Sequence, residues 1–282
     1  MKKGVDPVLT FWKGFGIFKL GSTTEAIREV EMIQSRREIT YAAITALIYY
    51  HEHCRIVDRE TVDNLKYSQE NAHNTASDRD LINASLFYLH IKELKRASQT
   101  ITGVIESNQS NLNAIAIKGW VYLGAPKPEY VEKGLQIFEN VLNEEEGGNP
   151  KHLEALLGRS AYYEMTKKYN VAIEIITEVT IAYKDFTPAN IIKAKLHILN
   201  AEWELVIETI QKVLQYDEYN IEALRIYIFY LLSREKDTDS LMDKFSDLSM
   251  AFNQQEAKNA DAYYSYSKLF ARICSRDIDI LK

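Results

Sequence analysis

Apolar residues recur along the chain at positions i, i+4 and i+7, which is the spacing of one face of an α-helix. In the clearest copy, a small residue, Ala172, is followed by Ile176 and Val179. The remaining copies are Ala26, Val30 and Ile33; Thr61, Leu65 and Ser68, a weak copy; Ala97, Ile101 and Val104; Gly134, Phe138 and Val141; Val206, Ile210 and Val213; and Leu241, Phe245 and Leu248. Successive copies begin 34 to 38 residues apart. The pattern predicts a repeated helical unit.

A second helical segment precedes each of these copies, and the two together predict a helix hairpin. The preceding segments contain small residues, which allow two helices to approach closely. These small residues are Gly14, Ser85, Gly119, Ser160 and Ala194. Pro7, Pro150 and Pro188 stand at or just before expected helix starts, where the missing N–H costs little, and Pro126 and Pro128 are expected in a turn. No proline interrupts an expected helix.

A helix-turn-helix unit of this length, with aromatic residues in its first helix, resembles the tetratricopeptide repeat. Such hairpins bury their faces only against their neighbours. We therefore expect an all-α fold, a right-handed superhelix or α-solenoid with a concave groove, forming a single array over residues 1–282. The expected hairpins cover residues 7–34, 39–73, 77–107, 111–143, 151–183, 187–216 and 219–251, followed by one truncated helix at 258–273. Both ends look like cuts through a longer array.

The stretch AYYEMTKKYNVA, residues 161–172, crowds tyrosines and lysines together and raises the question of acid–base or phosphate chemistry. Neighbouring repeats carry aromatic residues at the corresponding positions. We interpret Tyr162, Tyr163 and Tyr169 as aromatic wedges between paired helices, with the lysines solvated at the helix end.

Five residues are expected on the groove face of successive first helices, and they are the candidate protein-binding site: Trp120, Tyr163, Lys195, Tyr227 and Tyr230. Aromatic anchors on a concave surface suit a partner's helix or extended peptide. The other interpretation is that these rings pack against the next helix.

Composition excludes several classes of function. The chain has 282 residues, of which 46% are hydrophobic and 26% charged, with a net charge of -6. Such a charge provides no basic field for nucleic acid, and no apolar run is long enough for direct membrane insertion. The opening segment does not read as a secretory signal. Cys54 and Cys274 lie far apart in sequence, which favours reduced thiols in the cytosol.

Candidate chemistry is sparse. In HEHC, His51 and Cys54 share a helical face but His53 points elsewhere, and a zinc site needs three or four converging ligands. The GFG of residues 14–16 does not continue into a phosphate-binding loop. With no nucleophile, base and orienting residue in a recognisable pattern, we expect no enzyme, no metal and no cofactor.

Several stretches in one order carry a more specific resemblance: DPVLTFWKGFGIFKLGSTTEAIREVE, VDRETV, EALLGRSAYYEMTKKYNVAIE, NIEALRIYIFYLLSRE and NADAYYSYSKLFARICSRD. They resemble the N-terminal part of the tetratricopeptide repeat protein 21 family, although Lys92 stands where a turn glycine is expected. Members of that family are several times longer, so the chain is expected to be a fragment or a truncated product.

The resemblance implies a non-catalytic scaffold subunit of intraflagellar transport complex A. Its implied role is in retrograde ciliary transport, cilium assembly and trafficking of ciliary membrane proteins. The implied partners are other complex A subunits, foremost the WD40-repeat ones, and complex B or the retrograde dynein within trains. The implied location is the cilium or flagellum, at the axoneme and ciliary base, and the cytoplasm.

Two alternatives stay open at this point. One is a generic peptide-binding adaptor such as a chaperone cofactor, for which charge swaps at Lys92 and Arg96 would abolish peptide binding. The other is the regulatory array of an enzyme whose catalytic domain lies beyond Lys282.

Overall fold

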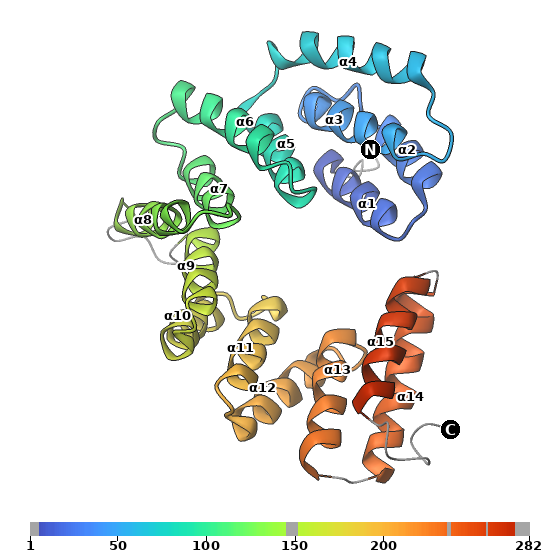
Figure 1. Ribbon diagram of the computed structural model, residues 1–282, viewed down its shortest axis with the longest axis vertical. Helices are drawn as coiled ribbons and strands as arrows, with labels where there is room; N and C mark the ends of the chain where they lie inside the picture. The colour runs from blue at the N-terminus through green and yellow to red at the C-terminus, as the bar shows by residue number, and fades with distance from the viewer. Residues whose placement is uncertain (1–5, 145–151, 236–237, 258, 274–282) are drawn as a thin grey trace, which may run out of the picture. The chain divides into compact units, whose positions relative to one another are not determined.

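The computed structural model describes residues 6–144, 152–235, 238–257 and 259–273, and every regular element within these ranges is helical (Figure 1). The predicted all-α fold is therefore confirmed. The chain divides into two compact units, Met1–Glu144 and Glu145–Lys282. The expected single array over residues 1–282 stays a prediction.

The first unit contains helix hairpins, in each of which we name the first helix A and the second helix B. The pairs are α1 (Pro7–Lys19) with α2 (Thr23–Glu31), α3 (Thr40–Glu52) with α4 (Arg59–His73), α5 (Asp78–His90) with α6 (Leu94–Ser107), and α7 (Leu112–Leu123) with α8 (Pro128–Glu144). The two helices of a pair pack against each other, as α5 and α6 do in Figure 1.

The second unit repeats this organisation. Its pairs are α9 (Leu153–Met165) with α10 (Tyr169–Ala182), α11 (Thr187–Leu199) with α12 (Trp203–Tyr216), and α13 (Ile221–Tyr230) with α14 (Thr238–Gln255); a π-helical turn, Leu231–Glu235, extends α13. A further A helix, α15 (Ala260–Ile273), follows. It packs on α14, where the rings of Phe245 and Phe270 lie 5.0 Å apart.

The repeated apolar trios form the buried faces of the B helices. Ala172, Ile176 and Val179 are completely buried in α10, and the trios of α6, α8 and α12 are buried as well. Ala26 and Val30 are buried in α2, with Ile33 buried just past its end, whereas in α14 Leu241 and Leu248 are buried and Phe245 is half-buried. The weak copy in α4 is different, because Val62 is its buried residue and Ser68 is exposed. The i, i+4, i+7 pattern therefore located every B helix; in α4 Leu65 packs against the buried clusters, but the pattern missed Val62 and wrongly included Ser68.

Small residues of the A helices bring the paired helices close together, as predicted. A Cβ atom on Gly119 would lie 2.6 Å from the ring of the buried Phe138 in α8. The Ser85 hydroxyl, also buried, donates to the carbonyl oxygen of Ala97 in α6 at 3.0 Å. Ala194 is completely buried in α11. These positions tolerate no bulk because the partner helix occupies the space.

The prolines lie largely as predicted. Pro7 begins α1, Pro188 is in the first turn of α11, and Pro126 lies in the connection before α8. Pro128, expected in that connection, instead begins α8, because the first helical position needs no N–H donor. Pro150 lies outside the described residues.

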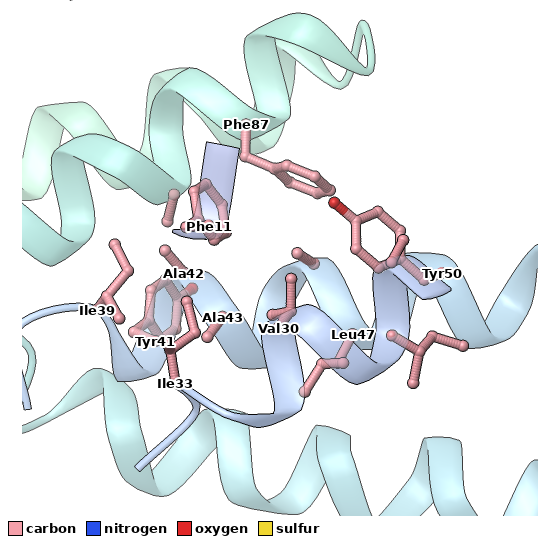
Figure 2. Close-up of a cluster of buried hydrophobic side chains, with 14 residues drawn as sticks. Phe11, Val30, Ile33, Ile39, Tyr41, Ala42, Ala43, Leu47, Tyr50 and Phe87 are labelled. Carbon is pink, nitrogen blue, oxygen red and sulfur yellow. The ribbon is translucent and has the colours of Figure 1, made fainter. Parts of the chain in front are cut away.

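One buried cluster of the first unit brings together aromatic rings of three A helices with aliphatic side chains of α2 and α3 (Figure 2). The ring centroid of Phe87 in α5 lies 5.9 Å from that of Phe11 and 5.5 Å from that of Phe15, both in α1. Tyr50 of α3 completes the group, 6.1 Å from Phe87. Helix α1 therefore contacts the A helix two hairpins further along the chain, and rings fill the space between these helices.

Four turns between A and B helices share one backbone conformation. The residue in the left-handed region is Gly21, Lys92, Lys167 or Ala201, with φ of 82°, 67°, 59° and 61°. Lys92 therefore adopts the conformation for which a glycine was expected. The left-handed region is less favourable for residues with a Cβ, so three of these turns carry some backbone strain.

Candidate functional site

The predicted groove residues all lie on A helices, but they belong to different units. Trp120 is on α7 of the first unit, whereas Tyr163, Lys195, Tyr227 and Tyr230 are on α9, α11 and α13 of the second. The half-buried Trp120 ring meets Phe138 of its own hairpin edge-on, with centroids 5.8 Å apart. For Trp120, packing within the hairpin is therefore part of its role.

The tyrosines of the second unit are half-buried and have close neighbours. The Tyr163 ring lies edge-on to Tyr162 at 5.3 Å, with the ammonium group of Lys168 at 5.9 Å. Tyr227 has the ammonium group of Lys244, from α14, at 6.0 Å. Tyr230 packs with the buried cluster of α13, α14 and α15. The rings combine packing with partial exposure, and whether a partner contacts them stays a prediction.

Lys195, the charged member of the set, is part of a network that joins three A helices. Its Nζ lies 3.0 Å from Oε2 of Glu222 on α13. Arg225, one turn further along α13, donates to the same oxygen at 2.6 Å. The other oxygen, Oε1, accepts a hydrogen bond of 2.9 Å from the hydroxyl of Tyr266 on α15. One carboxylate thus connects α11, α13 and α15.

The electrostatics of this network favour an ionised Glu222. Burial by itself raises the pKa of a carboxylate, but the hydrogen bond from Lys195 and the charges of Arg225 and Lys195 outweigh it and hold the pKa of Glu222 below its usual range. Burial and the Glu222 charge raise the pKa of Tyr266 to about 12, so its hydroxyl stays a donor. The Arg225 guanidinium also lies over the Tyr266 ring, 5.6 Å from its centroid. These groups orient helices and present a polar surface.

The sequence reasoning found Lys195 but missed Glu222, Arg225 and Tyr266. Glu222 and Tyr266 are 44 residues apart, and nothing local marks them as partners. The one local signal is the i, i+3 spacing of Glu222 and Arg225, which the search for aromatic anchors did not consider.

The A helices of the first unit present a different surface. Trp12 of α1 donates from Nε1 to Oδ1 of Asn83 on α5 at 3.1 Å, and its ring lies 5.5 Å from that of His90. Together with the Phe11 and Phe15 contacts to Phe87, this contact covers the facing sides of α1 and α5. The first three A helices therefore fill the space between them with their own side chains.

The HEHC residues lie at the end of α3. Nδ1 of His53 is 2.7 Å from the carbonyl oxygen of Tyr49, and Sγ of Cys54 donates to the carbonyl oxygen of Tyr50 at 3.5 Å. Within the ranges that the structure describes, no three His, Cys, Asp or Glu side chains come together in a possible metal site. Cys274 lies outside those ranges. None of the described helices is long and apolar enough to cross a membrane.

Solved structures share the fold. A tetratricopeptide repeat protein from Parabacteroides merdae is similar with a TM-score of 0.56 and 16% identity, over 92% of this chain and 96% of that one. A thermophilic TPR protein of Thermus thermophilus gives a TM-score of 0.52 and 13% identity, over 80% of this chain and 100% of that one. These likenesses confirm a tetratricopeptide-repeat α-solenoid.

Sequence comparisons identify the family. The profile described as "Tetratricopeptide repeat protein 21 N-terminal ARM repeat" matches residues 1–207. Tetratricopeptide repeat protein 21B of Homo sapiens is 30% identical over 279 residues, which are 99% of this chain and 21% of that protein. Tetratricopeptide repeat protein 21A of Mus musculus is 30% identical over 271 residues, 96% of this chain and 20% of that protein. The chain thus spans about a fifth of the length of these relatives, and it belongs to the tetratricopeptide repeat protein 21 family.

Proposed function

We propose that this chain forms part of a non-catalytic scaffold subunit of intraflagellar transport complex A. The observation that carries the proposal is the match to tetratricopeptide repeat protein 21B over 99% of the chain. The proposed partners are the WD40-repeat subunits of complex A, with complex B or the retrograde dynein reached within trains. The proposed role is retrograde transport and trafficking of ciliary membrane proteins, in the cilium and the cytoplasm.

Helix hairpins are physically suited to such a role. The small and apolar residues of each hairpin pack within it and against the neighbouring hairpins. The remaining surface can therefore contact other proteins. In the second unit, the bonds of Glu222 to Lys195, Arg225 and Tyr266 fix three A helices relative to one another. A surface held in this way loses little conformational entropy when a partner binds.

Co-purification from ciliated cells tests the proposal. The bait is a full-length family protein that contains this segment, and the measurement is the recovery of each complex A subunit across a salt series. One variant changes the A-helix surface of the second unit, with Lys195→Glu and Tyr264→Ser. A matched control carries Lys66→Glu and Tyr216→Ser, which are exposed on B helices.

We expect wild type and control to recover the WD40-repeat subunits and the A-helix variant to recover less. Equal recovery by both variants would indicate that the subunits contact another surface of the protein. The proposed scaffold role would then still stand. If the wild-type protein recovers no complex A subunit, the proposal is wrong. In that case, loss of peptide binding on charge reversal of Lys92 and Arg96 would favour the adaptor alternative.

A further inference from the structure

A hollow of about 880 Å³ opens between two connections of the first unit. One side is formed by residues 21–25 and Arg28, from the α1–α2 turn and from α2 itself. The other side is formed by Cys54, Arg55 and Ile56, which follow α3. Each of two adjacent hairpins therefore contributes an arginine. We call this feature the turn hollow.

Neither arginine of the turn hollow is neutralised by the protein. Arg28 and Arg55 are both exposed, and within the residues that the structure describes neither side chain forms an ion pair or a hydrogen bond. Glu25 is the one carboxylate among the residues that line the hollow. The lining therefore carries more positive than negative charge.

Other carboxylates of α2 and α3 are bound to cations outside the hollow. Oε1 of Glu29 lies 3.0 Å from Nζ of Lys13, and Oε1 of Glu52 lies 2.8 Å from Nζ of Lys66. Because each of these carboxylates already has a cation of its own, the excess positive charge of the hollow remains.

Lys19 adds to the positive charge at the α1–α2 turn. It is the last residue of α1, and its Nζ lies over the ring of Phe15, 5.3 Å from the centroid. The nearby His90 of α5 experiences the same field: burial lowers its pKa, and the positive charges of Lys92 and Lys19 lower the pKa further. Like charges held close together repel one another, and a negatively charged partner relieves that repulsion.

The turn hollow also offers an apolar contact. Ile56 is 87% exposed and is one of the lining residues. Single exposed apolar side chains are common on protein surfaces, but this one lies in the same hollow as two arginines without partners. A ligand that combines negative charge with an apolar side chain would use both features.

We propose that the turn hollow binds an acidic segment of a protein partner, with carboxylates at Arg28 and Arg55 and an apolar side chain against Ile56. The planar guanidinium group presents paired N–H donors that match the two oxygens of a carboxylate. A short segment suits the charge distribution better than a membrane or a nucleic acid does. The whole chain has a net charge of -6, so an extended polyanion would also face its acidic remainder.

The inference goes beyond the proposed function, because it depends on the charges of the first unit and would hold for any partner with such a segment. Attraction of this kind speeds association and weakens as salt screens the charges.

A designed peptide tests the proposal on the whole 282-residue chain. The probe is a fluorescent peptide of about 10 residues, long enough to span roughly 35 Å when extended, in which glutamates flank one leucine. One comparison peptide has glutamine in place of each glutamate, and another has serine in place of the leucine. Binding is measured by fluorescence anisotropy at low and at high salt.

Two double variants locate the binding. Arg28→Glu with Arg55→Glu changes the turn hollow. Arg36→Glu with Arg37→Glu is the matched control, because it reverses two exposed arginines in the connection between α2 and α3, which are not among the residues that line the hollow. Both variants change the net charge by the same amount, and circular dichroism checks that both keep their helical content.

We expect the hollow variant to bind the acidic probe at least about tenfold more weakly than wild type, and the control to bind like wild type. Both comparison peptides should bind wild type more weakly than the probe does, and high salt should weaken the binding of the probe. Absence of binding to wild type, equal loss in the two variants, or equal binding of the glutamine peptide would overturn the proposal.

Three further measurements test other occupants of the turn hollow. Binding of wild type, but not of the hollow variant, to vesicles that contain phosphatidylserine would assign the hollow to a membrane. Displacement of the probe by inorganic phosphate, at an ionic strength at which chloride leaves the probe bound, would assign it to a phosphate group. A dimer that light scattering detects for wild type and not for the hollow variant would assign it to a second copy of the chain. Each of these results would overturn the proposal.

Discussion

Asp80 of α5 accepts a hydrogen bond of 2.8 Å from the backbone N–H of Ala42 in α3. Its second carboxylate oxygen accepts another, also of 2.8 Å, from the N–H of Tyr41. The residue at the N-cap of α3, Ile39, makes no side-chain hydrogen bond there. A completely buried carboxylate from the next hairpin therefore caps α3.

Removing this cap should strongly destabilise the chain. Asp80→Ala leaves two buried N–H groups without acceptors, and we expect the free energy of unfolding to fall by roughly 2–4 kcal/mol. Burial raises the pKa of Asp80 despite the two N–H donors. Asp80→Asn keeps one acceptor and should therefore cost less than the alanine variant.

Urea unfolding followed by circular dichroism measures the effect. Asp58→Ala is the matched control, since Asp58 caps its own helix α4 at an exposed position. The control should destabilise the chain less than Asp80→Ala, because its N–H groups can bond to water instead. Equal losses in Asp80→Ala and Asp58→Ala would show that the tertiary cap has no special importance.

Close helix packing predicts opposite effects for two glycines. Gly119→Ala places a Cβ 2.6 Å from the ring of Phe138, and we expect a loss of roughly 1–3 kcal/mol because that buried ring must move. Gly103→Ala meets nothing within 4 Å in the middle of α6 and should add up to about 1 kcal/mol, because alanine favours a helix over glycine. Thermal unfolding of both variants gives the signs. A stable Gly119→Ala variant would contradict the close contact of α7 and α8.

The left-handed turns predict another pair of opposite effects. Ala201→Gly relieves the strain at φ 61°, and the free energy of unfolding should rise by about 1 kcal/mol. Gly21→Ala imposes a Cβ at φ 82° and should lower it by a similar amount, although the space around Gly21 is open. Denaturant unfolding measures both changes as shifts of the midpoint, provided that the slope of free energy against denaturant concentration stays the same. Effects of the same sign would rule out backbone strain as their cause.

The Glu222 network predicts a pH-dependent contribution to stability. Because its folded-state pKa is below the usual value, Glu222 stabilises the fold above about pH 4.3, and this contribution disappears as the pH falls through the folded-state pKa. Glu222→Gln should therefore destabilise the chain more at pH near 7 than at pH near 3. Since the Glu222 side chain is 40% exposed, we expect at most about 1 kcal/mol at neutral pH.

Urea titrations of wild type and Glu222→Gln at both pH values check this. The exposed Glu204→Gln serves as the matched control for replacing a glutamate by glutamine at an exposed position. A pH-independent difference for Glu222→Gln would mean that hydrogen bonding alone, without the ionised carboxylate, holds α11, α13 and α15 together.

The sequence by itself determined the hairpins. An apolar face at i, i+4 and i+7 is a local property of one helix, and small residues such as Gly119 and Ser85 mark where its partner approaches. These signals need no knowledge of distant residues, so the B-helix cores followed from the pattern. In α4, where the pattern is weak, it missed Val62 as the buried residue.

The tertiary structure decided which A-helix surfaces stay open. Three hydrogen bonds join residues that are far apart in sequence. Trp12 and Asn83 are separated by 71 positions, Tyr41 and Asp80 by 39, and Glu222 and Tyr266 by 44. Each contact depends on how successive hairpins are rotated on one another, and that rotation is the sum of many small packing differences that no local pattern carries. Stacking therefore decides that rings fill the space between the first A helices and that a shared carboxylate ties the last ones together.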